Sequence, residues 1–99
     1  MVIKKRSIRS TKSGWKKLVK QCFERDAHKC QICKRPGALH PHHIIPKSRL
    51  RVDHVDNLVS LCPECHRGVH DHLDGWPSVD EMIEEYWWRV GKFTQNGGN

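Results

Sequence analysis

Four cysteines occur as two Cys-x-x-Cys pairs, and this spacing is typical of a tetrahedral zinc site. Cys30 and Cys33 form the first pair, Cys62 and Cys65 the second, and 28 residues separate the pairs. Two residues between thiolates let both point at one ion from a tight turn, and structural zinc takes four such ligands. A single pair would be weak evidence, because redox pairs share the spacing. Two pairs around a predicted strand–loop–strand region predict a structural zinc ion.

Histidines provide a second set of metal ligands near the second cysteine pair. His66 and His70 are four residues apart in a predicted helix, so both imidazoles lie on one face. His42 and His43 are adjacent in a predicted strand, so they point to opposite faces. We expect His42 to join the helix pair on a catalytic metal ion, because three imidazoles and an open position suit such a site. His43 is then free beside the metal as a general base.

The remaining histidines and the fifth cysteine have simpler interpretations. His28, His54 and His72 are expected on the surface, whereas His40 shares a strand face with His42 and is a candidate for contacting either a metal ligand or the substrate. Cys22 belongs to the apolar stripe of a predicted helix, so we interpret it as a buried residue and not as a ligand.

Short elements must position these side chains. A helix is predicted from an N-cap at Ser13 to about Arg25, because apolar residues recur there with helical spacing. Residues 39–45 predict a strand that ends before Pro46, residues 47–56 a loop, and residues 57–62 a second strand. Pro63 then suits the first turn of a helix that ends near Gly75.

The C-terminal helix has the clearest local signal. Ser78 and Glu81 form a capping box, and apolar spacing continues from Val79 to Val90. Gly91 is predicted to end this helix, and residues 92–99 to form a flexible tail.

Composition limits the class of protein. The chain has 99 residues, and 36% of them are hydrophobic, so a metal would be a useful addition to a small core. Residues 1–35 hold 12 Lys and Arg against 2 acids, which indicates a polyanionic partner, most simply a nucleic acid. No stretch reads as a membrane span or a secretion signal, and paired cysteines fit a reducing compartment. The expected location is the cytoplasm of a bacterial cell or of a phage-infected host.

The strings HHIIPKS, DNLVSLCPECH and GVH resemble the HNH endonucleases, also called ββα-metal nucleases, in their zinc-knuckle form. The histidine, asparagine and histidine after which the family is named correspond to His43, Asn57 and His66, with 13 and 8 residues between successive members. The similarity covers roughly residues 28–72.

The resemblance implies a role for each matching residue. His43 would be the general base that activates water, and Asn57 would hold the loop and His43 in place. His42 stands where many members have Asp and would bind the catalytic metal with His66. His70 would be the third ligand, as in three-histidine members of the family.

The implied fold is a small α+β domain with the ββα-metal motif, a two-stranded hairpin plus helix held together by the four-cysteine zinc site. The N- and C-terminal helices that flank it lie outside the motif and are predicted from residue spacing alone. We expect a basic arm over residues 1–12 and a single nuclease domain over residues 13–91. The implied activity is metal-dependent DNA cleavage that leaves a 5′ phosphate and a 3′ hydroxyl. Imidazole ligands favour Zn²⁺, Mn²⁺, Ni²⁺ or Co²⁺ over the Mg²⁺ of Asp-bearing relatives.

DNA is the expected partner, bound through its backbone and with weak sequence preference. Basic residues near the motif or on the first predicted helix are the candidate phosphate contacts: Lys47, Arg49, Arg51, Arg67, Lys16, Lys17 and Lys20. Specificity would then come from a partner, such as a phage packaging protein, and the small size favours a phage or mobile-element setting.

Two non-catalytic functions compete with this interpretation. A zinc module could bind nucleic acid through its basic half, which explains the cysteines but gives the histidines no purpose. Alternatively, a zinc-stapled module could recruit a partner through its tryptophans, Trp76, Trp87 and Trp88. The nuclease interpretation requires His43 for activity, and the binding interpretations do not.

Overall fold

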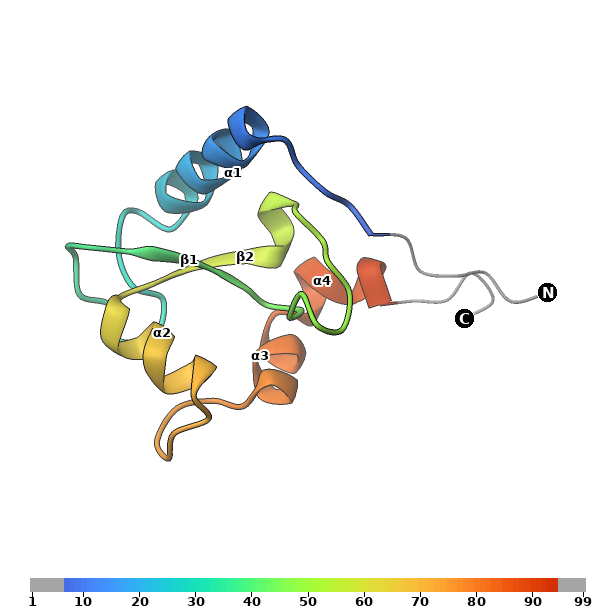
Figure 1. Ribbon diagram of the computed structural model, residues 1–99. Helices are drawn as coiled ribbons and strands as arrows, with labels where there is room; N and C mark the ends of the chain where they lie inside the picture. Colours follow the sequence, from blue (N-terminus) through green and yellow to red (C-terminus); the bar gives the residue numbers. More distant parts are fainter. Residues whose placement is uncertain (1–6, 95–99) are drawn as a thin grey trace.

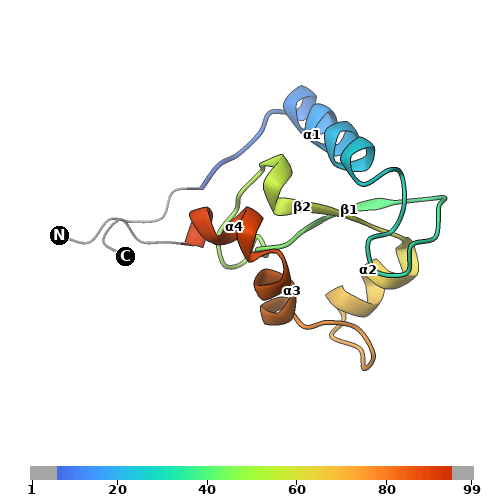
Figure 2. The ribbon, with the colours of Figure 1, turned by 180° about the vertical axis from the view of Figure 1, so that it is seen from behind.

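A two-stranded antiparallel hairpin lies at the centre of the domain, with helices on both of its sides (Figure 1). The structure is a computed structural model that describes residues 7–94. Helix α1 lies on one side of the hairpin, and α2 and α3 lie on the other, as the opposite view also shows (Figure 2). This is the small α+β architecture that the sequence predicts. The elements are α1 Lys12–Arg25, β1 His40–His43, the 3₁₀ turn η1 Val55–Asn57, β2 Leu58–Leu61, α2 Pro63–His70, α3 Val79–Glu85 and α4 Trp87–Thr94.

Helix α1 begins slightly earlier than predicted and is fixed to β2 at its other end. Its N-cap is Thr11, whose hydroxyl accepts from the Gly14 N–H at 3.1 Å, so the predicted cap at residue 13 is wrong. Cys22 is fully buried, as predicted, and its sulfur lies 3.4 Å from the Ser60 hydroxyl. The next contact is an acid that the sequence did not identify: Asp26 accepts from the Ser60 N–H at 2.9 Å.

The segment before α1 is part of the folded domain. Ile8 pairs with Val52 in a parallel bridge: its N–H donates to the Arg51 carbonyl at 2.9 Å, and its carbonyl accepts from the Asp53 N–H at 2.6 Å. Of the predicted basic arm, residues 1–12, the part that the structure describes is therefore held against the loop. Its residues 1–6 lie outside the described residues.

The hairpin brings the predicted histidines to the start of α2. His42 pairs with Val59 and His43 with Leu58, and both strands are shorter than predicted. All four residues of β2 are buried, because helices cover both of its faces. The main core is formed by the hairpin region, α2, α3, α4 and the first cysteine turn, and its buried members are Cys30, Ile44, Ile45, Val59, Leu61, Cys65, Val69, Met82 and Val90.

The C-terminal region forms two short helices where the sequence predicts one. The capping box of Ser78 and Glu81 is present, but the chain bends at Tyr86 between α3 and α4. Met82 of α3 and Val90 of α4 both enter the core, so each of the two helices is packed against it. Gly91 lies inside α4 and does not end it; a Cβ there would lie 2.8 Å from the Trp87 ring.

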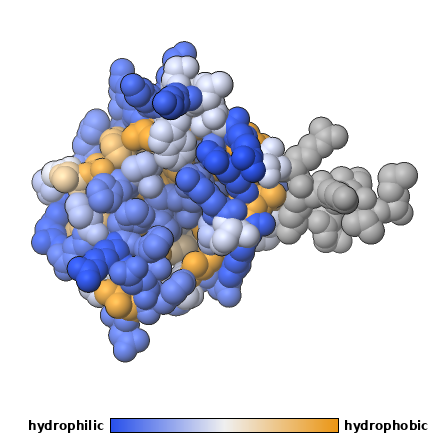
Figure 3. Space-filling model, in the orientation of Figure 1, coloured by the Kyte–Doolittle hydropathy of each residue, from blue (hydrophilic) through white to orange (hydrophobic). Residues whose placement is uncertain are grey.

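The described surface is mostly polar. Hydrophilic residues dominate the face in Figure 3, with hydrophobic residues gathered in small separate patches. Among residues 7–94, no helix combines the length and the apolar composition that crossing a membrane requires.

Candidate functional site

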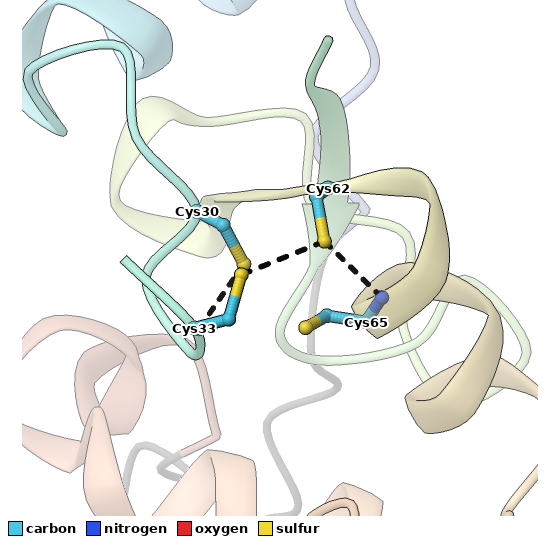
Figure 4. A group of neighbouring side chains, drawn as sticks. All are labelled: Cys30, Cys33, Cys62 and Cys65. Atoms are coloured by element: carbon cyan, nitrogen blue, oxygen red, sulfur yellow. Dashed lines mark hydrogen bonds between the residues drawn. The ribbon is translucent and has the colours of Figure 1, made fainter. Parts of the chain in front are cut away.

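The four paired cysteines converge on one point from two different segments (Figure 4). Cys30 and Cys33 lie in the turn after α1, whereas Cys62 is the N-cap of α2 and Cys65 lies in its first turn. Their sulfur atoms all lie within 4.8 Å of one another. The Cys33 and Cys62 sulfurs are 3.7 Å apart, close to the edge of a tetrahedron with Zn–S bonds of about 2.3 Å. The cluster therefore fits the predicted structural zinc site.

The thiols differ in how readily they ionise. The Arg35 guanidinium donates to the Cys33 sulfur and lowers the pKa of that thiol to about 6. Burial raises the pKa of the Cys65 thiol to about 12. A buried thiol of this kind loses its proton only when a cation binds, because the thiolate is the ligand form. Metal binding is thus coupled to the burial of this part of the core.

The four histidines of the predicted catalytic site line one cavity of about 480 Å³. It lies where the end of β1 meets α2 and α1, and Trp15, Lys47 and Ser48 also line it. The cavity lining includes His42, His43, His66 and His70.

Three of these imidazoles lie on the α2 side of the cavity. The His42 and His66 ring centroids are 5.4 Å apart, and those of His66 and His70 are 6.1 Å apart. Burial lowers the pKa of His42 to about 4, and burial also lowers the pKa of His66. Neutral imidazoles are the form that binds a metal. Among the described residues, however, only the four cysteines form a group whose ligand atoms all lie within 4.8 Å of one another, so these imidazoles do not converge on one point as the cysteines do. His70 is exposed, and its Nδ1 lies 3.1 Å from an Asp71 oxygen.

His40 also belongs to this group, although the sequence offered only its strand face as a signal. Its Nδ1 lies 3.0 Å from the Nδ1 of His66. Of the histidines expected on the surface, His28 and His72 are exposed. His54 is half-buried instead: its Nδ1 accepts from the Asp56 N–H, and its ring packs near Phe93.

His43 points the other way along the strand, toward α1. Its ring stacks on Trp15 with centroids 5.3 Å apart and an angle of 6° between the planes. Its Nε2 lies 3.0 Å from Asp53 Oδ1. Burial lowers the pKa of His43, and the contact with Asp53 offsets this only in part. The imidazole is therefore neutral at pH 7.

Asp53 determines which nitrogen of His43 carries the proton. Its side chain is fully buried. Burial alone would raise the pKa of Asp53, but hydrogen bonds from Ser10, His43 and Arg51 outweigh this and lower the pKa below its usual range. An ionised carboxylate only accepts, so His43 Nε2 must donate, and Nδ1 is the nitrogen with a free lone pair.

The sequence did not identify Asp53, because it lies in a loop that reads only as polar. Its Oδ2 accepts from the Ser10 N–H at 3.0 Å and lies 3.1 Å from the Ser10 hydroxyl. Arg51 also donates to Oδ2. A histidine base often has a hydrogen-bond partner on its second ring nitrogen, so the sequence indicates that such a partner should exist. It does not indicate which acid is that partner.

Asn57 closes the loop between the strands. Its Oδ1 accepts from the Ile45 N–H at 2.8 Å, and its Nδ2 donates to the Val52 carbonyl at 3.0 Å. The side chain is fully buried. These bonds join the residues just after β1 to the loop that carries Asp53, so they hold both partners of the His43–Asp53 contact.

The candidate phosphate contacts lie in different places. Lys47 lines the histidine cavity, and Lys16 and Arg51 line a neighbouring cavity. Arg49 pairs with Asp80 at 2.9 Å, and Arg67 with Asp71 at 3.6 Å. Lys17 and Lys20 are exposed on α1 and line neither cavity.

Comparisons with known proteins match the same part of the chain. A family model described as HNH endonuclease matches residues 30–72, which hold both cysteine pairs and all four histidines of the cavity. The chain is 53% identical over 32 residues to the type IV methyl-directed restriction enzyme EcoKMcrA of Escherichia coli strain K12. That match covers 32% of this chain and only 12% of the restriction enzyme.

A second relative is Anaredoxin from Nostoc sp. strain PCC 7120. It is 30% identical over 56 residues, which make up 56% of this chain and 74% of Anaredoxin. The two relatives differ in name and in size. The region that they share with this chain is therefore better described by the family model than by either relative's name.

Proposed function

We propose that this chain, which belongs to the HNH endonuclease family in its zinc-knuckle form, is a metal-dependent DNA endonuclease. The reaction is hydrolysis of a phosphodiester bond to a 5′ phosphate and a 3′ hydroxyl. One observation carries the proposal: His42, His43, His66 and His70 line a single cavity whose other walls include Lys47. Neither non-catalytic alternative requires histidines to meet in this way.

His43 is the general base of the proposed reaction. Its Nε2 donates to Asp53, so Nδ1 is the atom that takes a proton from the attacking water. Stacking on Trp15 and the buried carboxylate of Asp53 together fix the plane of the ring. Asp53 acts through His43, as a positioning residue.

His42, His66 and His70, which line the cavity, would hold the catalytic metal. A divalent cation there would offset the negative charge that develops on the scissile phosphate and on the leaving 3′ oxygen. Lys47, which lines the same cavity, contacts a non-bridging phosphate oxygen. These contacts reach the backbone and carry little sequence information, so specificity would come from a partner protein.

A partner-binding role is the second candidate, and the exposure of two tryptophans favours it. Trp87 is 49% exposed and Trp88 is 74% exposed, with the Arg89 guanidinium 4.5 Å from the Trp88 ring centroid. Trp76 does not belong to this surface, because it packs on α2, where a Cβ on Gly68 would lie 2.2 Å from its ring. Such a surface is compatible with catalysis.

A plasmid assay tests the proposed function. Protein freed of loosely held metal is incubated with supercoiled plasmid and Mg²⁺, Mn²⁺, Co²⁺, Ni²⁺ or Zn²⁺. We expect nicked or linear product with at least one ion and none with His66→Ala, because this change removes a metal ligand. The control is His72→Asn, an exposed histidine outside the cavity whose positive φ of 56° asparagine tolerates. Equal cleavage by wild type and His66→Ala would contradict the proposal.

Asp53→Asn is expected to slow cleavage about 10²–10⁴-fold without unfolding the protein, the range typical of general-base loss. Ser10 and Arg51 donate to Oδ2, so the amide oxygen must occupy that position. The amide NH₂ then faces His43 Nε2, which must accept, and the proton moves to Nδ1, where it blocks the base.

The pH–rate profile separates this effect from a change in ionisation. His43 is the base when neutral, and its lowered pKa places the acid limb of the wild-type rate below pH 6.5. Asp53 raises the pKa of His43, so Asp53→Asn moves that limb to lower pH while the plateau falls. Asp80→Asn, which removes an exposed carboxylate, is the control and should change neither. A plateau unchanged in Asp53→Asn would show that Asp53 does not position the base.

A further inference from the structure

A second cavity opens beside the histidine cavity at the start of α1. Its volume of about 580 Å³ lies within the range of roughly 300–1,000 Å³ that small-ligand sites occupy. The segment before α1, the first turns of α1 and the loop after β1 form its walls. We call it the α1 groove and define it by its four cationic residues, Lys12, Lys16, Lys47 and Arg51.

The α1 groove is positively charged and has no acidic residue in its described lining. Arg51 is paired with Asp53, whose carboxylate is fully buried and turned away from solvent. Lys12, Lys16 and Lys47 have no acidic partner within 4.0 Å among residues 7–94. Three like charges around one concave surface repel one another, and a bound anion relieves this repulsion. The Ser13 hydroxyl adds a donor to the same wall.

The groove is continuous with the histidine cavity, because Trp15 and Lys47 line both. A polyanion bound at His43 therefore reaches the groove past Trp15 and Lys47 without meeting an acidic residue in the described lining of either cavity. The other candidate contacts do not extend this path: Arg49 and Arg67 are paired with acids on α3 and after α2.

We propose that the α1 groove binds a backbone phosphate of the DNA strand that lies beside the scissile phosphate. The proposal rests on the proposed DNA endonuclease function and deepens it, since it assigns the path of the bound strand from the histidine cavity across Trp15 to the first turns of α1. The groove lies outside residues 30–72 of the family match, apart from Lys47 and Arg51. It positions the strand and takes no part in bond cleavage.

Binding measurements without added divalent metal test the site. We would measure fluorescence anisotropy of a labelled duplex of about 20 base pairs with the full chain at several KCl concentrations. Lys12→Gln/Lys16→Gln is expected to weaken binding and to reduce the slope of log K against log salt by about one, because the groove is assigned one phosphate and each lost phosphate contact changes the slope by about 0.9. The matched control is Lys17→Gln/Lys20→Gln, which removes the same charge from the same helix outside the groove.

The outcomes distinguish this site from the proposed function. A larger slope change for the groove variant than for the control supports the site, even if no metal supports cleavage. Equal slope changes for both variants overturn it, even if the wild type cleaves plasmid. If cleavage is found, the groove variant should raise KM and leave kcat unchanged, whereas a fall in kcat alone would also overturn the assignment.

A chemical change on the DNA locates the contact. Replacing single phosphates by neutral methylphosphonates should reveal one position beside the cleaved bond whose loss weakens the wild type. The same replacement should have little effect on Lys12→Gln/Lys16→Gln, because the two changes remove one interaction. If the effects of the methylphosphonate and of the two lysine substitutions are fully additive at every position, no phosphate binds in the groove. Single-stranded DNA and an RNA hairpin, measured alongside, distinguish a preference for duplex DNA from general binding of phosphodiesters.

Discussion

Removal of zinc is expected to unfold the domain. Structural zinc in small domains contributes about 10–16 kcal/mol of apparent binding free energy, which equals or exceeds the total stability of about 5–15 kcal/mol of a typical domain. Cys30 and Cys65 are themselves members of the buried core, so losing the ion leaves a gap where packing should be densest. Circular dichroism during titration with a strong chelator should show loss of helix in step with zinc release.

Substitution of single cysteines sharpens this prediction, because the chain contains its own control. Cys33→Ser removes a ligand and should lose zinc together with the folded state. Cys22→Ser changes a thiol that is more deeply buried than Cys33, contacts Ser60 and lies outside the cluster, so it should retain one zinc per chain and remain folded. A Cys33→Ser protein that keeps its zinc and its melting temperature would contradict the structural site.

His43→Ala is expected to lower the cleavage rate about 10²–10⁴-fold, the usual contribution of a general base. Folding should survive, because the ring packs on one face against Trp15 and is not part of the main core. Zinc content and helical signal should match the wild type, and the rate should be measured with the ion that best supports plasmid cleavage.

His54→Ala is the matched control for this change. His54 lies in the same loop as Asp53 and caps η1, so its loss costs about 1 kcal/mol of stability, but it does not line the cavity. It should therefore cleave at nearly the wild-type rate. If His43→Ala cleaves as fast as His54→Ala while holding zinc, His43 is not the base, and a non-catalytic role becomes the better account.

Local patterns predicted much of this fold. The spacing of the cysteine pairs, the helical stripe of α1 and the capping box of Ser78 each depend on residues within a few positions of one another, and the structure contains all three. The bend at Tyr86 was missed, because the helical periodicity of the apolar residues continues through it.

The candidate site was predictable only in part, for a similar reason. Helical spacing placed His66 and His70 on one face, and the sequence analysis put His42 with them and His43 beside them; all four line one cavity. The partner of His43 could not be found, since Asp53 is ten residues away through a loop. Ser10 holds Asp53 across 43 residues, and no local pattern carries such a contact.

Because Ile8 is bridged to the loop, the functional part of the domain begins before its first helix. A shortened version that starts at residue 12 would keep every helix and strand, both cysteine pairs and all the histidines. It would lose Ser10, and with it two of the hydrogen-bond donors that hold the Asp53 carboxylate against the base. The shortest unit that retains these contacts thus begins with Ile8. An expression design guided by secondary structure alone would lose the Thr11 cap of α1 as well as the donors to Asp53, and so would loosen both the helix start and the base.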